Sequence, residues 1–432
     1  MSNYCVATYR LFDDKADFHK KATGIAVGLT VGSWTELPEA KKAEMEKHLG
    51  KVLSVKEGVS PELGRYADIE IAYPDVNFSR DIPALLVTVF GKLSMDGKIK
   101  LIDLRFSDSF LQAMPGPKFG AAGVRDLLGV HDRPLLMSIF KSVIGYDMDG
   151  LREQFSGQAL GGVDLIKDDE ILFENPLTPI ERRVEACMQA AREAERITGQ
   201  KLLYAVNLTG KTSKLREQAL RAIDAGANAF LFNVLAYGYD ALSELAADPD
   251  ISVPIMAHPA MAGAMYPSPT YGIAAPVLLG KLLRLAGADL VLFPSPYGSV
   301  VMPREENLAI KHVLLTDHLK EDYAAPDISA AGSAAADHSA ANLPSDFTLK
   351  ASMPVPSAGI HPGLVPLILR DFGSEVIVNA GGGIHGHPMG TAAGGKAFRQ
   401  AINAAQQGIS LREAAARQPE LQAAIDAWGV KE

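Results

Sequence analysis

Apolar and polar residues alternate in several stretches of the first 120 residues, and helical spacing separates these stretches. Alternation predicts half-buried strands, because successive side chains of a strand point to opposite faces. The predicted strands lie at residues 5–12, 66–73 and 99–106, and the predicted helices lie at residues 13–28 and 79–93. We therefore expect residues 1–120 to form a small α+β domain of the ferredoxin-like kind.

The pattern changes in residues 121–432, where short, continuously apolar runs recur and each is followed by helical spacing. Such runs are typical of strands covered on both faces, as in a parallel sheet. Eight of them lie at residues 133–140, 163–168, 201–208, 229–236, 254–258, 289–293, 349–356 and 375–380. Eight strand–helix units predict a (β/α)8 barrel. A doubly wound open sheet is the alternative, but no glycine-rich dinucleotide turn follows the first strands.

Two local features refine this picture. Residues 324–346 are rich in Ala, Ser, Asp and Gly, so we expect a flexible insertion between the sixth barrel helix and the seventh strand. Cys187 falls on the apolar stripe of the helix that follows the second run, which predicts a core position.

Composition narrows the class of protein. The chain has 432 residues, 47% of them hydrophobic and 22% charged, as expected of a globular protein with two domains. The net charge of −9 argues against a nucleic-acid partner. Two cysteines are too few for a disulfide framework or a cysteine-based zinc site. We see neither a signal-peptide pattern nor an apolar run of about 18 residues, so we expect a cytoplasmic protein without a membrane segment.

The second run ends in Lys167-Asp168-Asp169-Glu170. Strand alternation points Lys167 and Asp169 the same way, and Glu170 follows as the strand gives way to a loop. Two carboxylates at this spacing suit a hard cation such as Mg2+. A protonated lysine joins such a site only as a charge partner, or after conversion into an oxygen-bearing adduct. The alternative is a solvated charge cluster in a strand-to-helix loop.

Polar or ionisable residues follow nearly every predicted barrel strand, and barrel active sites form at these strand ends, so the pattern favours an enzyme. Glycines after the last two strands let backbone N–H groups approach a phosphate, although a flexible hinge is the alternative. The candidate phosphate residues are Ser357, Gly359, Gly381, Gly382 and Gly383. The spacing of His385 and His387 also suits metal ligands, but without a third ligand we expect them to support this site. His258 is a candidate catalytic residue, with a satisfied core histidine as the alternative.

These residues together resemble the RuBisCO superfamily over essentially the whole chain. Residues 161–170, GGVDLIKDDE, resemble the segment whose lysine is carbamylated by CO2 and binds Mg2+ with the following Asp and Glu. The resemblance implies one Mg2+ per subunit on carbamylated Lys167, Asp169 and Glu170. It also implies that Lys141 is the first active-site lysine and that His258 is the histidine of the RuBisCO His-Arg pair. The segments PSAGIH and NAGGGIHGHPMG resemble the two phosphate-binding loops.

Three departures in the barrel distinguish the chain from the carboxylases of that superfamily, and two more lie in the amino-terminal domain, where Gly28 replaces a glutamate and Lys92 replaces an asparagine. The second lysine of their Lys-Pro-Lys motif is replaced by Val143, and the arginine after the histidine is replaced by Pro259. The loop at residues 294–300 lacks the lysine that handles CO2. The resemblance therefore implies metal binding and enolisation without carboxylase activity.

Within the superfamily, runs such as DIPALLVTVFGKLSMDGKIKLIDL and FPSPYGSV are similar to RuBisCO-like (type IV) proteins of methionine salvage. This similarity implies an isomerase that tautomerises 2,3-diketo-5-methylthiopentyl-1-phosphate to 2-hydroxy-3-keto-5-methylthiopentenyl-1-phosphate. It also implies a homodimer in which the amino-terminal domain of one subunit closes the barrel of the other. We expect Lys92 to be the base, acting in trans, with Lys141 as its competitor and His258 orienting substrate oxygens. Another RuBisCO-like sugar-phosphate isomerase and a non-catalytic phosphate-ligand binder remain as alternatives.

Overall fold

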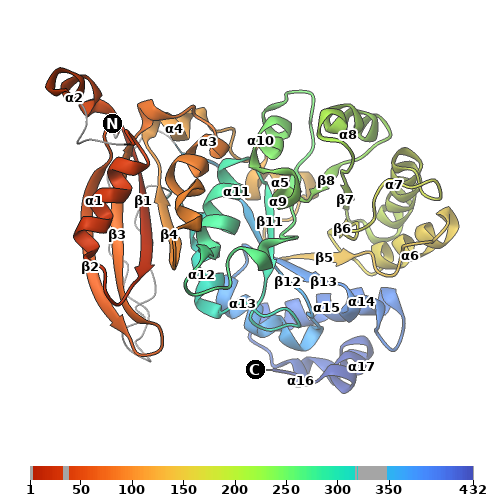
Figure 1. The fold of residues 1–432 in the computed structure, drawn as a ribbon. Coiled ribbons are helices and arrows are strands. Elements are labelled where there is room, and N and C mark those ends of the chain that lie inside the picture. Colours follow the sequence, from red (N-terminus) through yellow and green to blue (C-terminus); the bar gives the residue numbers. More distant parts are fainter. Residues whose placement is uncertain (1–2, 33–37, 317–318, 320–347, 432) are drawn as a thin grey trace. The chain divides into compact units, whose positions relative to one another are not determined.

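A computed structural model describes residues 3–32, 38–316, 319 and 348–431 (Figure 1). It contains two compact units. One comprises residues 1–115, 261–286 and 316–349, and the other comprises residues 116–260, 287–315 and 350–432. The insertion expected at residues 324–346 lies outside the described residues. None of the helices in the described ranges combines the length and the apolar character that crossing a membrane requires.

The first unit is built on a five-stranded sheet with the order β10-β4-β1-β3-β2. Its central strands match the predicted ones: β1 (Tyr4–Phe12), β3 (Gly64–Pro74) and β4 (Ile99–Arg105). Two strands were not predicted: β2 (Lys51–Ser60), whose side chains are largely exposed, and β10 (Gly272–Ile273), which pairs with β4 in parallel. Because β10 follows β9 in the chain, this sheet is assembled from distant segments.

Aspartate side chains cap the first turns of two helices of this unit. The side chain of Asp17 accepts a hydrogen bond from the backbone N–H of Lys20, so α1 (Phe18–Gly28) begins later than the predicted residue 13. Asp81 caps α3 (Ile82–Leu86) in the same way. A π-helical turn (Val87–Gly91) continues α3 towards Lys92. The unit also contains α2 (Glu39–Met45) and α4 (Asp108–Ala113).

The second unit contains the predicted barrel. Its eight parallel strands have the hydrogen-bonded order β12-β11-β9-β8-β7-β6-β5-β13, and β12 packs beside β13, so the barrel is nearly closed. The strands are β5 (Leu135–Ile139), β6 (Leu165–Lys167), β7 (Leu203–Asn207), β8 (Ala229–Phe232), β9 (Ile255–Ala257), β11 (Leu290–Pro294), β12 (Met353–Ser357) and β13 (Ile377–Ala380). The prediction at residues 229–236 was wrong in extent: the second half of this apolar run forms α9 (Val234–Tyr237), because apolar character alone does not separate a strand from a buried helix.

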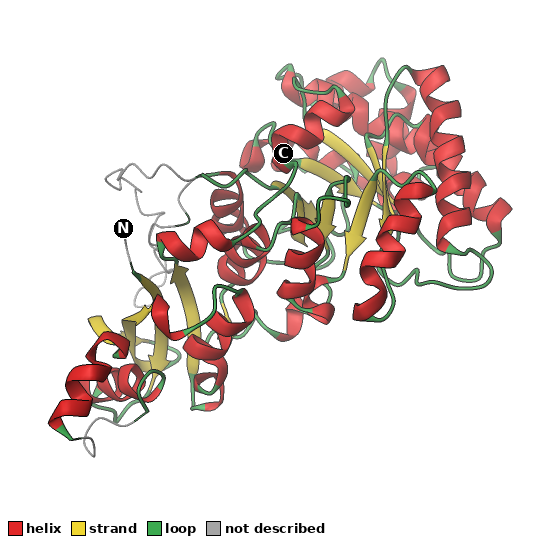
Figure 2. Ribbon diagram, turned by 90° about the horizontal axis from the view of Figure 1, so that it is seen from above, coloured by secondary structure: helices red, strands yellow, loops and turns green. Residues whose placement is uncertain are grey.

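Helices surround the strands of this unit (Figure 2). They are α6 (Met148–Leu160), α7 (Ile180–Thr198), α8 (Leu215–Asp224), α10 (Tyr239–Ala247), α12 (Arg304–Leu315), α13 (Val365–Phe372), α15 (Thr391–Gln406), α16 (Leu411–Ala415) and α17 (Pro419–Trp428). Cys187 of α7 is fully buried, as predicted. Helix α5 (Gly120–Leu128) packs Val124 and Leu128 against the first residues of the strands, among them Leu135 and Leu165. The carboxyl ends of the strands are therefore left for the site.

Candidate active site

Lys167 is the last residue of β6, and its side chain is only 1% exposed. Its Nζ donates to the carbonyl oxygen of Asp168 at 2.7 Å and lies 3.9 Å from Oε2 of Glu170. Burial lowers the pKa of Lys167 to about 8, although the carboxylates of Glu170 and Asp169 oppose this shift. The amine is therefore much closer to its neutral form at physiological pH than an ordinary lysine is.

Lys141 and His258 lie against the same carboxylates. Nζ of Lys141, which follows β5, donates to Oδ2 of Asp169 at 2.9 Å. Burial opposes ionisation of Asp169, but this hydrogen bond and the charge of Lys141 outweigh it and lower the pKa of the carboxyl. Nε2 of His258, which follows β9, lies 3.5 Å from Oε2 of Glu170. Lys141, Lys167, Asp169, Glu170 and His258 form what we call the lysine–carboxylate cluster.

His258 is held as a neutral imidazole in one tautomer. Burial lowers the pKa of His258 well below its ordinary value, and the charges of Lys167 and Lys141 lower it further. The backbone N–H of Ala260 donates to Nδ1 at 3.2 Å, so the ring proton is placed on Nε2, which faces Glu170. His258 can therefore donate a hydrogen bond at the cluster without adding charge.

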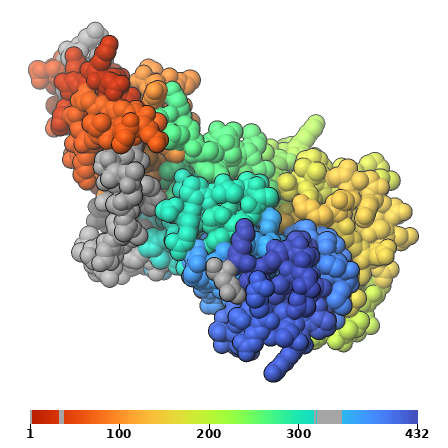
Figure 3. All heavy atoms as spheres, turned by 90° about the horizontal axis from the view of Figure 1, so that it is seen from below, coloured from red at the N-terminus to blue at the C-terminus, as the bar shows by residue number. Residues whose placement is uncertain are grey.

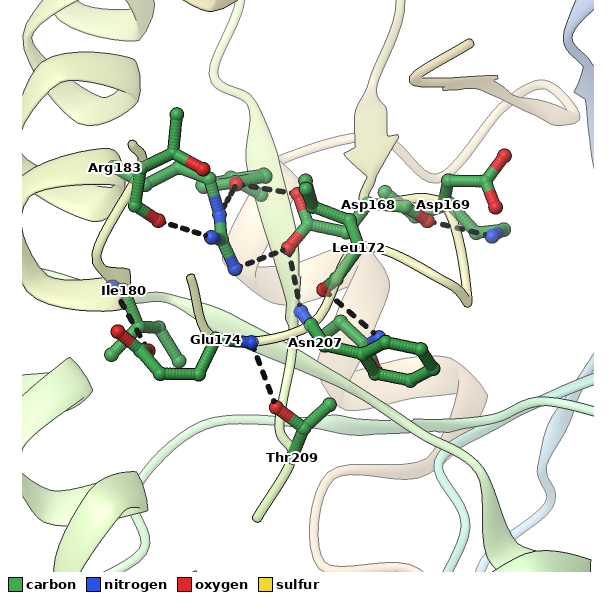
Figure 4. A network of polar contacts seen from close by, with 12 residues as sticks. Asp168, Asp169, Leu172, Glu174, Ile180, Arg183, Asn207 and Thr209 are labelled. Carbon is green, nitrogen blue, oxygen red and sulfur yellow. Dashed lines mark hydrogen bonds and ion pairs between the residues drawn. The ribbon is translucent and has the colours of Figure 1, made fainter. Parts of the chain in front are cut away.

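Asp168 points away from the cluster and anchors its turn (Figure 4). It accepts hydrogen bonds from Arg183 of α7 at 3.1 Å, from the Tyr204 hydroxyl at 2.6 Å and from the backbone N–H of Asn207 at 2.8 Å. The amides of Asn207 and Asn233 donate to the carbonyl oxygen of Glu170 at 3.0 and 3.2 Å. These contacts fix both sides of the turn that presents Asp169 and Glu170.

The predicted phosphate residues lie on two adjoining loops, after β12 and β13. Oγ of Ser357 accepts from the side-chain amide of Asn379 at 2.8 Å, which links the two strand ends. A Cβ added to Gly381 would lie 3.1 Å from Cε of Lys141, so this loop reaches the lysine–carboxylate cluster. A Cβ added to Gly383 would overlap the carbonyl oxygen of Ile360, whereas one added to Gly382 would meet nothing within 4 Å.

Both loop histidines bind backbone carbonyl groups. Nε2 of His385 lies 2.7 Å from the carbonyl oxygen of Ile139. His387 is 4% exposed, with Nε2 lying 2.8 Å from the carbonyl oxygen of Glu420. Lys92 belongs to the first unit, where it follows the π-helical turn and its side chain is exposed.

The donor set fits magnesium only if Lys167 is modified. Within the part of the chain that the structure describes, no group of three or more His, Cys, Asp or Glu side chains is arranged to hold a metal ion. The cluster supplies two carboxylates and a buried amine with a lowered pKa. Because a neutral amine reacts with CO2, Lys167 can become a carbamate, and an all-oxygen donor set of the kind that Mg2+ prefers results.

The fold and the cluster define a class of protein: (β/α)8-barrel enzymes with a separate sheet-containing unit and a lysine–carboxylate site at the carboxyl ends of the strands. The chain belongs to the ribulose bisphosphate carboxylase large-chain family. The model of the catalytic domain matches residues 120–428, and the model of the N-terminal domain matches residues 2–110.

Several relatives cover nearly the full chain. The 2,3-diketo-5-methylthiopentyl-1-phosphate enolase of Geobacillus thermodenitrificans is 54% identical, covering 99% of this chain and 98% of the relative. The enzyme of the same name from Bacillus velezensis is also 54% identical, covering 98% of each chain. A solved rubisco-like protein from Alicyclobacillus acidocaldarius is 47% identical with a TM-score of 0.86, covering 99% of each chain. A dimeric archaeal Rubisco from Hyperthermus butylicus is 30% identical with a TM-score of 0.84, covering 99% of this chain and 96% of the relative.

Proposed function

We propose that this chain is an isomerase of methionine salvage that enolises 2,3-diketo-5-methylthiopentyl-1-phosphate to 2-hydroxy-3-keto-5-methylthiopentenyl-1-phosphate. The observation that carries this proposal is the 54% identity, over nearly the whole of both chains, to enzymes named for that reaction. Val143, Pro259 and the lysine-free loop at residues 294–300 support the absence of carboxylase activity.

In this proposal, carbamylated Lys167, Asp169 and Glu170 hold one Mg2+ per subunit. When bound there, the ion supplies Lewis-acid polarisation of the substrate carbonyls. The turn that presents these ligands is fixed from both sides by Asp168 and by the amides of Asn207 and Asn233. The ligand positions are therefore set before substrate arrives, which reduces the reorganisation needed for the reaction.

The substrate phosphate binds the two glycine-containing loops in this proposal. Ser357 and Gly359 come from the loop after β12, and Gly381, Gly382 and Gly383 come from the loop after β13. The approach of Gly381 to Lys141 supports a phosphate position beside the lysine–carboxylate cluster. Holding the phosphate there fixes C1, the carbon that loses a proton, relative to the base.

Lys92 removes the C1 proton in this proposal, acting at the barrel of the other subunit of a homodimer. Two observations support Lys92 over Lys141. The Lys92 amine is exposed, whereas Lys141 donates to Asp169 at 2.9 Å and is held as a charge partner of that carboxylate. His258, neutral and protonated on Nε2, orients the substrate oxygens. The enzyme acts in the cytoplasm.

The direct test is an ultraviolet time course that follows the conjugated enol product. The purified protein, with Mg2+ and bicarbonate, is mixed with the diketone phosphate, and a parallel sample contains EDTA. Ribulose bisphosphate with labelled bicarbonate serves as the carboxylation control. We expect enol formation that EDTA abolishes and no fixed label. If no enol forms, the proposed function is wrong, and another sugar-phosphate isomerase or a phosphate-ligand binder takes its place.

A further inference from the structure

Tyr297 ties the loop between β11 and α12 to the end of α13. Its hydroxyl donates to the carboxylate of Asp371 and lies 3.4 Å from the carbonyl oxygen of Leu367. Asp371 also accepts two hydrogen bonds from Arg304, the first residue of α12, at 2.8 and 2.7 Å. One carboxylate therefore anchors both the middle of the loop and the helix that follows it.

The Asp371 anchor is strongly held. The Asp371 side chain is 1% exposed, and Arg370 adds a contact at 3.1 Å. Burial opposes ionisation, but the hydrogen bonds from Arg304, Tyr297 and Arg370 outweigh it and lower the pKa of Asp371 to about 2. The carboxylate is ionised throughout the physiological range, so the Tyr297 hydroxyl has a charged acceptor, and hydrogen bonds to charged groups are the stronger kind.

The loop that Tyr297 anchors rests on the candidate phosphate turn. A Cβ added to Gly298, the next residue, would overlap the carbonyl oxygen of Ala358, and one added to Gly359 would lie 2.5 Å from the backbone nitrogen of Ser299. The N–H of Ser295 donates to the carbonyl oxygen of Ser357 at 3.0 Å. The two loops are thus in backbone contact on both sides of Tyr297.

The phosphate turn has a backbone that needs such support. Ala358 has φ +74° and Gly359 has φ +68°, so two successive residues adopt the left-handed conformation. That conformation is unfavourable for alanine, and it persists only where surrounding structure imposes it. The contact from Gly298 falls on the carbonyl group of Ala358, the strained residue itself.

We propose that Tyr297 and Asp371 are positioning residues, which press the β11–α12 loop onto Ser357-Ala358-Gly359 and so set that turn to receive the substrate phosphate. Neither side chain needs to touch the substrate. This inference rests on the proposed function for the identity of the substrate, but it assigns a role that the reaction itself does not require: the shape of the phosphate turn depends on a hydroxyl group in the neighbouring loop.

The test uses Tyr297→Phe, which removes the hydroxyl and keeps the ring. Two quantities are measured: the dissociation constant of inorganic phosphate, by calorimetric titration, and KM and kcat for the diketone phosphate. We expect both KM and the phosphate dissociation constant to rise about tenfold, from loss of one charge-assisted hydrogen bond, with kcat and Mg2+ affinity within about twofold of wild type. A lower kcat at unchanged KM would overturn the proposal, as would wild-type phosphate affinity in the variant.

Tyr237→Phe is the matched control. The Tyr237 hydroxyl also ties a strand-end loop in place, through two hydrogen bonds to the backbone of Gly210 at 3.0 Å. We expect this variant to bind inorganic phosphate as wild type does, and equal weakening in both variants would contradict the proposal. Asp371→Asn provides a second test at the other end of the contact.

If wild type fails to convert the diketone but Tyr297→Phe still weakens phosphate binding, the proposed function fails and this inference stands. If wild type binds no phosphate, the inference fails.

Discussion

Arg183 and Asp168 form an ion pair with a separation of 3.1 Å between Nη2 and Oδ2, and both side chains are fully buried. The pair directs Asp168 into the core, whereas the side chain of Asp169 points away from Arg183 (Figure 4). Breaking a buried pair is costly because the remaining charge keeps its desolvation penalty. Correct placement of the candidate metal ligands is therefore coupled to the stability of the barrel.

Asp168→Asn should lower the free energy of unfolding by about 3–5 kcal/mol, because it leaves the buried charge of Arg183 without its anionic partner. Urea denaturation followed by circular dichroism measures this change. Asp126→Asn is the control, since Asp126 is 72% exposed and its contact with His131 spans 3.7 Å. That variant should stay within about 0.5 kcal/mol of wild type. Equal effects of the two substitutions would show that the pair does not anchor the turn.

Lys167→Ala should weaken Mg2+ binding by about tenfold or more and abolish its dependence on bicarbonate, because the variant cannot form the proposed carbamate, the third oxygen-donating group. Isothermal titration with Mg2+, in the presence and absence of bicarbonate, measures both effects. Lys201→Ala removes an exposed lysine near the start of β7 and should bind Mg2+ as wild type does. Bicarbonate dependence that survives in Lys167→Ala would contradict the carbamate.

Lys92→Ala should lower kcat by about 10²–10⁴-fold, the range expected for loss of a general base, with unchanged Mg2+ affinity. Lys98→Ala is the control from the same exposed segment and should retain activity.

Subunit mixing tests whether Lys92 acts in trans. Hybrid dimers of Lys92→Ala with Lys167→Ala subunits contain one site with both lysines if Lys92 crosses the subunit boundary. Activity should therefore reappear when the two inactive proteins are mixed after mild dissociation. No recovery in proven hybrids would place Lys92 in the site of its own subunit or remove it from catalysis.

Gly383→Ala and Gly382→Ala should differ sharply although the positions are adjacent. An alanine Cβ at residue 383 overlaps the carbonyl oxygen of Ile360, whereas one at residue 382 has open space. Gly383→Ala should therefore cost about 1–3 kcal/mol in unfolding free energy and weaken phosphate binding, while Gly382→Ala should be within about 0.5 kcal/mol of wild type. Thermal unfolding with and without inorganic phosphate measures the stability and the phosphate binding of each variant. Equal melting temperatures for the two variants would contradict the prediction.

Asp371 should contribute a pH-dependent part of the stability. Its pKa falls from 3.8 to about 2 on folding, so the contribution is fully present above about pH 4 and is lost as the pH falls towards 2. The magnitude is on the order of 1–2 kcal/mol after solvent screening. The difference in unfolding free energy between wild type and Asp371→Asn should therefore shrink between pH 5 and pH 3. A difference that is constant with pH would contradict this assignment.

The barrel could be predicted because each of its strands is a continuous apolar run, and burial on both faces leaves that signal in the sequence. Strand β2 escaped prediction because its side chains are largely exposed and alternate weakly. Strand β10 has two residues, too few for any periodicity, and only its pairing with β4 defines it. The pattern at residues 229–236 predicted one element where the chain forms two, because strand and buried helix share the same composition.

For the site, strand ends placed Lys141, Lys167, Asp169, Glu170 and His258 at one end of the barrel, and the structure brings them together. Strand alternation separated Asp168 from Lys167 and Asp169, but it did not indicate which residues Asp168 contacts on the other face. The sequence did contain a signal for Arg183, because this charged residue lies beside Val184 on the apolar stripe of α7. The contact between Tyr297 and Asp371 spans 74 positions and left no local pattern.

The origin of β10 limits how this polypeptide can be divided. Lys281 donates to Asp103 at 2.7 Å, and Lys100 donates to the carbonyl oxygen of Tyr266 at 2.8 Å, so residues 261–286 are bound into the sheet-containing unit (Figure 3). A fragment ending at residue 115 would lose β10 and both contacts and would expose the edge of β4. Segments of the two units therefore alternate along the chain. Exchange of residues 1–115 between relatives should succeed only when residues 261–286 are exchanged with them.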